Sequence, residues 1–105
     1  MSNKTVFIRL LLIPLIILLS DHAYAGNKYW VAKNDGTTKY WNDNANWAHS
    51  SGGRRGKSYP RIADKVVFDN KSTVDCTLRA KARTRRLQIG STYTGTINLA
   101  GFDMD

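Results

Sequence analysis

The 105-residue chain contains no glutamate and has few of the residues that build catalytic or metal sites. Its only cysteine is Cys76, so a disulfide within the chain is excluded. Of its two histidines, only His49 lies beyond the N-terminal segment, which excludes a histidine cluster for zinc. With so few of these residues, neither a Ser-His-Asp nor a Cys-His catalytic set is expected. The sequence therefore predicts a protein that is not an enzyme and holds no metal or cofactor.

Residues 1–25 follow the three-part pattern of a secretory signal peptide. Lys4 and Arg9 precede an apolar run over residues 10–19, and Ala23-Tyr24-Ala25 supplies small residues where a signal peptidase cleaves. This apolar run is short, because a membrane span needs about 20 residues. We therefore expect cleavage after Ala25, a location outside the cell or on its surface, and no permanent membrane span.

Cleavage would leave residues 26–105, one small domain with a strong positive charge. Two of the 16 basic residues and one of the 8 acidic residues lie in the signal peptide, so the domain carries 14 basic and 7 acidic side chains, a net charge of +7. This balance favours polyanionic partners such as anionic glycans, lipopolysaccharide or extracellular nucleic acid. Cys76 alternates with Val74 and Leu78, which indicates a buried side chain. Half of an intermolecular disulfide is the alternative.

Short alternations of apolar residues predict strands, and helical periodicity is hard to find after residue 25. The predicted strands are residues 28–33, 64–69, 73–78, 86–90 and 95–101. Each is bounded by Gly, Asn, Asp, Pro or Ser, and residues 34–39 and 48–60 are expected to be loops. In one of these strands, Leu87 and Ile89 are expected to share a face.

Strands of this length fit two all-β folds. Thr- and Gly-containing corners separate the later strands, and Asp35-Gly36 is the only tight two-residue hairpin signal. These features favour a parallel β-solenoid, in which each short strand stacks on the next coil, over a small antiparallel β-sandwich. We expect a Trp-rich cap over residues 26–63, followed by solenoid-like strands over residues 64–105.

Several motifs follow one another in order along the chain. They are Tyr29-Trp30-Val31, Trp41 with Asn46-Trp47, Ser50 to Gly53, Pro60, Asp64-Lys65-Val66-Val67-Phe68-Asp69 and the segment 87–101. This pattern resembles segments of large secreted bacterial proteins, namely autotransporter-like or adhesin-like β-solenoid passengers and related β-strand repeat surface proteins. The resemblance implies a structural or adhesive surface module. Those proteins usually run on for many coils, and an open terminal coil would favour self-association.

The stretch YWNDNANWAHSSGG, residues 40–53, contains two tryptophans, Trp41 and Trp47. Exposed indoles stack on sugars, so glycan binding is one interpretation. The alternative, which we favour, is that both rings are buried with Trp30, because this half of the chain has few other large apolar side chains. A structural role is also expected for four later residues: Asp64, Phe68, Asp69 and Cys76. The two aspartates are expected to fix turns, since calcium requires six to eight oxygen ligands.

Basic residues alternate along RAKARTRR, residues 79–86. If this segment is extended, four of them lie on one side: Arg79, Lys81, Arg83 and Arg85. Such a stripe would bind the phosphates or sulfates of a polyanion, and the alternative is a solvated face whose charge prevents edge aggregation. Four more basic residues would extend the patch: Arg86, Arg54, Arg55 and Lys57. A phosphate-binding loop in SGGRRGKS is excluded, because Ser51 stands where the first glycine is required.

Overall fold

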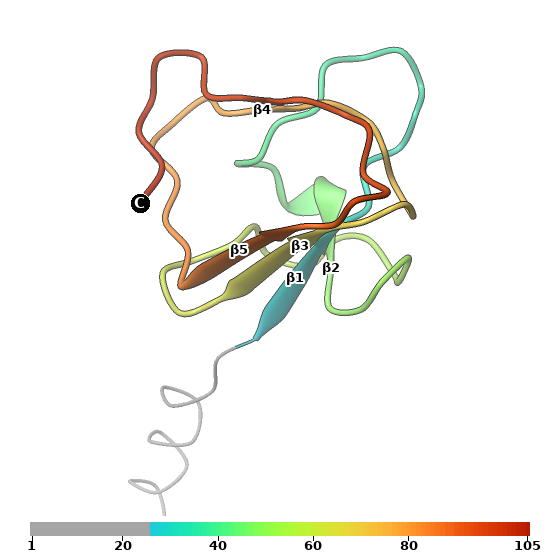
Figure 1. The fold of residues 1–105 in the computed structure, drawn as a ribbon, viewed down its shortest axis with the longest axis horizontal. Coiled ribbons are helices and arrows are strands. Elements are labelled where there is room, and N and C mark those ends of the chain that lie inside the picture. Colours follow the sequence, from blue (N-terminus) through green and yellow to red (C-terminus); the bar gives the residue numbers. More distant parts are fainter. Residues whose placement is uncertain (1–25) are drawn as a thin grey trace, which may run out of the picture.

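The computed structural model describes residues 26–105, so the predicted signal peptide lies outside the described residues. Within residues 26–105, no helix is long and apolar enough to cross a membrane. The described chain is all-β apart from one 3-10 turn (Figure 1). Its elements are β1 (Asn27–Trp30), η1 (Asn44–Asn46), β2 (Trp47–Ala48), β3 (Lys65–Phe68), β4 (Cys76–Thr77), β5 (Arg86–Ile89) and β6 (Ile97–Asn98).

Parallel pairing joins strands that are far apart in the sequence. The larger sheet has the order β2-β1-β3-β5, in which β1–β3 and β3–β5 are parallel and β1–β2 is antiparallel. The smaller sheet pairs β4 with β6 in parallel, and a parallel bridge adds Tyr40 beside Thr77. A further parallel bridge joins Ala82 to Met104. Since only one of these pairings is antiparallel, the alternative prediction of an antiparallel sandwich is wrong.

In the later parallel strand pairings, the two paired residues are always the same number of positions apart in the sequence. We call this number of positions the coil offset. Lys65 of β3 pairs with Arg86 of β5, and Cys76 of β4 pairs with Ile97 of β6 at the same separation. The bridge from Ala82 to Met104 is longer by a single position. Pairing of β1 with β3 spans a much longer interval, because the chain first makes an excursion through η1, β2 and a long loop.

These pairings arrange the chain as two walls. In Figure 1, β1, β3 and β5 lie side by side along one wall. The strand β4 lies with the red C-terminal part of the chain along the opposite wall. The space between the walls holds the core.

The core between these walls is built largely from tryptophan. Trp30, Trp41, Trp47 and Phe68 are fully buried. The Trp47 ring lies 5.1 Å from both other indoles in edge-to-face geometry, and Phe68 lies 5.5 Å from Trp30. Aromatic pairs of this kind add about 0.5–1.5 kcal/mol each beyond the burial of apolar area. The indole N–H of Trp30 also donates to the carbonyl of Val74 at 2.9 Å, which joins β1 to the segment before β4.

The strand β2 was not predicted from the sequence. Asp43 caps η1 by accepting a hydrogen bond from the backbone N–H of Ala45 at 3.0 Å, and the chain then re-enters the sheet. There Trp47 pairs with Trp30 of β1 in the antiparallel direction. A strand of two residues within an Asn-rich segment is too short to show a recognisable alternation. In the sheet, β2 nevertheless covers the edge of β1 that faces away from β3.

The predicted strands are present but shorter than expected, and one of them has an exposed face. Leu87 and Ile89 of β5 are 36% and 53% exposed. They pair in register with Val66 and Phe68 of β3, which are fully buried. Both strands have the same alternation, and the difference arises because no strand of residues 26–105 covers the outer side of β5.

Candidate functional site

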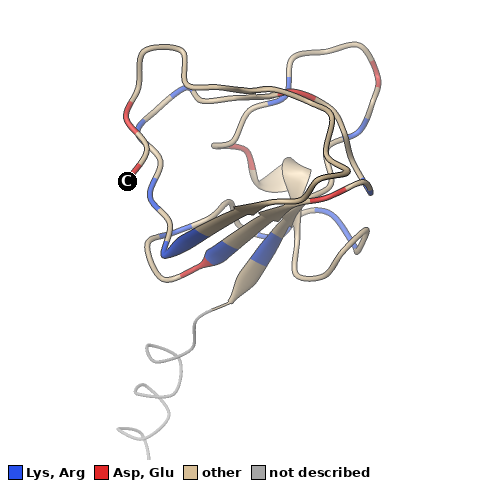
Figure 2. Ribbon diagram, viewed as in Figure 1, with Lys and Arg blue, Asp and Glu red and all other residues tan. Residues whose placement is uncertain are grey.

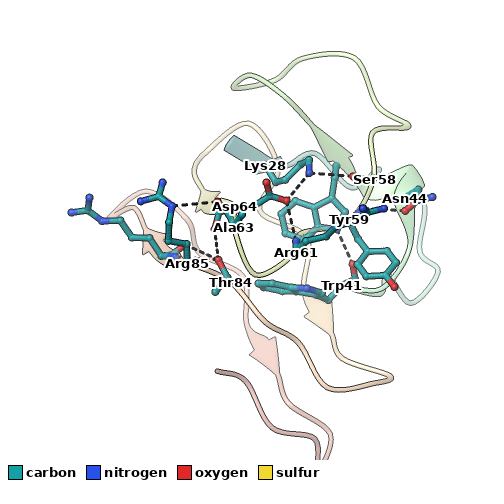
Figure 3. Close-up of polar contacts among 12 residues, drawn as sticks. Lys28, Trp41, Asn44, Ser58, Tyr59, Arg61, Ala63, Asp64, Thr84 and Arg85 are labelled. Atoms are coloured by element: carbon teal, nitrogen blue, oxygen red, sulfur yellow. Dashed lines mark hydrogen bonds and ion pairs between the residues drawn. The ribbon is translucent and has the colours of Figure 1, made fainter. Parts of the chain in front are cut away.

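The side chain of Asp64 joins three parts of the chain at the corner that precedes β3 (Figure 3). Its Oδ2 atom lies 2.7 Å from Nζ of Lys28 in β1, and the two side chains are only 10% and 6% exposed. The same oxygen accepts a hydrogen bond from the backbone N–H of Arg61 at 2.9 Å, and Lys28 also donates to Ser58 at 3.2 Å. A buried ion pair requires such additional hydrogen bonds to offset its loss of hydration.

The backbone around Asp64 positions the next pass of the chain. The carbonyl of Asp64 accepts hydrogen bonds from the backbone N–H of Arg85 and from the hydroxyl of Thr84, each at 2.8 Å. The guanidinium Nε of Arg85 donates to the neighbouring carbonyl of Ala63 at 3.2 Å (Figure 3). The start of β3 and the start of β5 are therefore fixed relative to one another.

Four basic residues gather at this place, and we call them the basic corner: Arg61, Lys65, Arg85 and Arg86. Lys65 and Arg86 are direct partners in the β3–β5 register, on strands roughly 4.8 Å apart. Lys65 is half-buried and the three arginines are exposed. Among the described residues, no ion pair includes any of the four, because Asp64 is committed to Lys28. Figure 2 shows the basic starts of β3 and β5 next to each other.

The segment of residues 79–86 is not extended throughout, so the condition for the predicted basic stripe is not met. The chain bends at residues 79–80 and forms a strand bridge only at Ala82 before β5 begins. Arg79 lies over the ring of Tyr40, 4.3 Å from its centre, whereas Arg85 contacts Ala63. The basic side chains at positions 79, 81, 83 and 85 are all exposed, and Ala82 between them is buried, as the alternation predicts. Because the backbone bends, these side chains do not lie along one straight line.

Three other members of the predicted patch are also separated from the basic corner: Lys81, Arg54 and Arg55. Lys81 forms an exposed ion pair with Asp105 at 3.0 Å. The loop after β2 carries three more basic residues: Arg54, Arg55 and Lys57. This loop is attached at the other end of β3, where Ser51 donates to Asp69 at 2.6 Å. Arg55 donates to the carbonyl of Val31 there, at 2.7 Å.

The glycan-stacking hypothesis for the tryptophans is wrong. Trp41 and Trp47 have no exposed surface, so a sugar ring cannot reach either face. Both belong to the core cluster, together with Phe68 and Cys76. The carboxylate of Asp69 accepts a hydrogen bond from the backbone N–H of Lys71 at 3.0 Å, as expected for a residue that fixes a turn.

The residues that nucleophilic or metal chemistry would use lie apart or are buried. Among residues 26–105, no group of three or more His, Cys, Asp or Glu side chains is arranged to hold a metal ion. Cys76 is fully buried in β4, and this burial raises the pKa of its thiol. An inaccessible thiol that stays protonated is a poor nucleophile. It also cannot form the intermolecular disulfide that was the alternative prediction.

A polar hollow lies between residues 34–39 and residues 73–77. Both charged residues of its lining already have partners, because Lys39 pairs with Asp35 and Asp75 accepts a hydrogen bond from the backbone N–H of Thr96 at 2.8 Å. Asp35 accepts hydrogen bonds from the side chains of Thr37 and Lys39 at 2.7 and 3.0 Å. These contacts hold the pKa of the Asp35 carboxyl well below its usual range. The hollow therefore offers a ligand mainly threonine hydroxyls, and the basic corner is the stronger candidate site.

No protein-family model, curated protein or solved structure matches this chain. The resemblance to β-solenoid passengers therefore stays a prediction. Function must be inferred from the geometry of the residues themselves.

Proposed function

We propose that residues 26–105 form the opening segment of a parallel β-solenoid in a secreted or surface-exposed protein, with a structural or adhesive role and no enzymatic activity. The observation that carries this proposal is the coil offset, which two parallel strand pairings share and which the bridge from Ala82 to Met104 repeats to within one position. In a solenoid, each coil repeats the path of the coil before it, so every ladder has the same separation in sequence.

The antiparallel strand β2 supports the assignment of residues 26–63 as a cap. Its pairing with Tyr29 and Trp30 occupies the edge of β1 that a preceding coil would otherwise use. Solenoid proteins need such caps, because an unpaired terminal coil promotes association with other chains. The proposed cap also contains the three tryptophans that bury one another, which lets this end of the core close on itself.

The other end of the described domain is suited to stacking a further coil. Leu99 and Phe102 are 43% and 42% exposed, and Leu87 and Ile89 are exposed with them. Within residues 26–105, β5 has no partner on its outer side. A further coil with the same offset would cover these side chains in the way that β5 covers β3. A second copy of the chain is the other occupant that would bury them.

The location outside the cell rests on the signal-peptide pattern in residues 1–25. The proposal of a non-enzymatic role rests on the scarcity and burial of the side chains that most often act as nucleophiles or bases in catalysis. Cys76 is buried and His49 is the only histidine beyond residue 25. A structural or adhesive module requires neither residue to be reactive.

The mass of the native protein in culture fractions of its source tests this proposal. Peptides from residues 26–105 should be found in a secreted or surface-bound species much larger than the domain, with an N-terminus at Gly26. A mature species of about 9 kDa, the size expected after removal of the signal peptide alone, would contradict the role as the opening of a longer solenoid. Retention inside the cell would contradict the location.

A further inference from the structure

We propose that the basic corner binds an acidic glycan through its sulfate or phosphate groups. This inference does not depend on the solenoid proposal, because it uses only contacts within residues 26–105. The four side chains come from two turns and two strands that are brought together by the parallel pairing.

Two cations of the corner lie directly opposite one another. Lys65 and Arg86 are register partners in adjacent parallel strands, and like charges directly opposite one another destabilise a sheet. Neither side chain forms an ion pair with any described residue. An anionic group bound between them would remove the repulsion and gain from both charges.

Hydrogen bonds hold the backbone of the corner, and its Asp64 carboxylate is paired internally. Asp64 sits among the four basic residues, yet its side chain is turned into the core and paired with Lys28 at 2.7 Å. Its carbonyl meanwhile fixes Arg85 and Thr84. The chain therefore anchors Arg85 without presenting the Asp64 carboxylate to a ligand, and this preorganisation lowers the entropic cost of ordering that one side chain.

Hydrogen-bond donors of the corner remain available to a ligand. Arg85 uses Nε to contact Ala63, which leaves its two terminal amino groups for a ligand. A guanidinium group held in this way matches the bidentate geometry of phosphate or sulfate oxygens. Arg61 and Arg86 are exposed beside it, and their guanidinium groups form no hydrogen bond with the described residues.

A glycan fits this corner better than a single-stranded nucleic acid does. Proteins that bind single strands combine cations with aromatic rings on which the bases stack. Tyr59 is 40% exposed, but Figure 3 shows it on the opposite side of Asp64 from Arg85. The three tryptophans are fully buried. The corner therefore supplies charge without a stacking platform.

The test is the affinity of the exported protein for a heparin oligosaccharide of defined length, measured by titration calorimetry at several salt concentrations. Lys65→Glu with Arg86→Glu should weaken binding at least tenfold. It should also reduce the slope of log K against log salt by about 1.4–1.8, as expected for two lost anion contacts. The control is Lys33→Glu with Arg54→Glu, which changes the net charge equally at exposed positions away from the corner. The control should bind within about twofold of the parent protein.

Three outcomes would overturn the proposal. Equal losses in both double variants would mean general attraction to a positively charged chain. Equal or tighter binding of a single-stranded oligonucleotide with the same number of charges would indicate nucleic acid instead of a glycan. The variant Lys65→Gln with Arg86→Gln relieves the repulsion and should keep or raise the melting temperature while losing affinity. Full affinity in that variant would show that the two cations are not the site.

Discussion

Lys28 and Asp64 form an ion pair at 2.7 Å between two distant parts of the sequence, and both side chains are almost completely buried. The pair closes the excursion that the chain makes between β1 and β3, since Lys28 belongs to β1 and Asp64 immediately precedes β3. It also determines the character of the basic corner, because it withdraws the local carboxylate from the surface. One contact therefore serves both the fold and the candidate site.

Removal of either partner of this pair should destabilise the domain strongly. Lys28→Ala or Asp64→Ala leaves the other charge buried without its partner, for which the usual cost is about 3–5 kcal/mol. The double variant should cost clearly less than the sum of the two single variants. The measurement is a double-mutant cycle by urea unfolding, followed by circular dichroism. Single-variant costs below about 1 kcal/mol would show that water screens the pair.

Trp47→Phe should destabilise the domain more than Trp41→Phe. Both indoles are fully buried, so the two substitutions remove similar apolar areas. The N–H of Trp47 donates to the carbonyl of Trp41 at 2.8 Å, whereas the N–H of Trp41 has no hydrogen-bond partner among the described residues. The loss of the hydrogen bond should add about 1 kcal/mol to the cost for Trp47. Urea unfolding followed by far-ultraviolet circular dichroism measures the difference, and an equal or reversed order would contradict it.

The sequence predicted the strands whose local pattern is strong. The alternation in DKVVF, between Asp64 and Asp69, marks β3, and the same reasoning finds β5. It did not predict β2, because a strand of two residues shows no alternation, and Ala48 was assigned to the loop over residues 48–60. Burial of the tryptophans was favoured on composition alone. The packing that excludes sugars from Trp41 and Trp47 could not be predicted, because it involves contacts with the distant residue Phe68 and so depends on tertiary structure.

The basic corner was missed because it depends on the pairing of distant strands. Lys65 and Arg86 are neighbours only through the coil offset, whereas the predicted stripe relied on adjacent positions in one segment. A signal was present in the sequence, because VDCTL at positions 74–78 and GTINL at positions 95–99 are separated by the same offset. Comparing the chain with itself at that offset also aligns DKVVF with RRLQI, and so brings the two cations together.

The domain should lose stability in mild alkali because of Cys76. Burial raises the pKa of this thiol above its ordinary value of 9.0, so the folded state holds the proton more tightly than the unfolded state does. The resulting stability is complete below pH 9 and is lost as the pH rises beyond it. The free energy of unfolding should fall by about 1 kcal/mol between pH 9 and pH 10.

The control for this effect is Cys76→Val, which keeps a small apolar side chain and removes the proton. Urea unfolding under reducing conditions at pH 7, 9 and 10 should show a drop in the parent protein that the variant lacks. Burial also raises the pKa of Tyr93, but from an ordinary value of 10.0, so its contribution begins at higher pH. The same drop in both proteins would assign the effect to another group.

Register-matched substitutions in β3 and β5 test whether a further coil stacks on the exposed end. Phe68 and Ile89 are partners in the parallel register, but Phe68 is fully buried and Ile89 is 53% exposed. In a protein limited to residues 26–105, Phe68→Ala should cost about 3–5 kcal/mol and Ile89→Ala much less, about 1 kcal/mol. In the native protein, a further coil would bury Ile89, and its substitution should then cost about 2–5 kcal/mol.

Unfolding of both forms by urea, with Phe68→Ala as the internal reference, gives the comparison. If Ile89→Ala costs the same in the two forms, no coil covers this side chain, and the proposal of a continuing solenoid loses its support at this end.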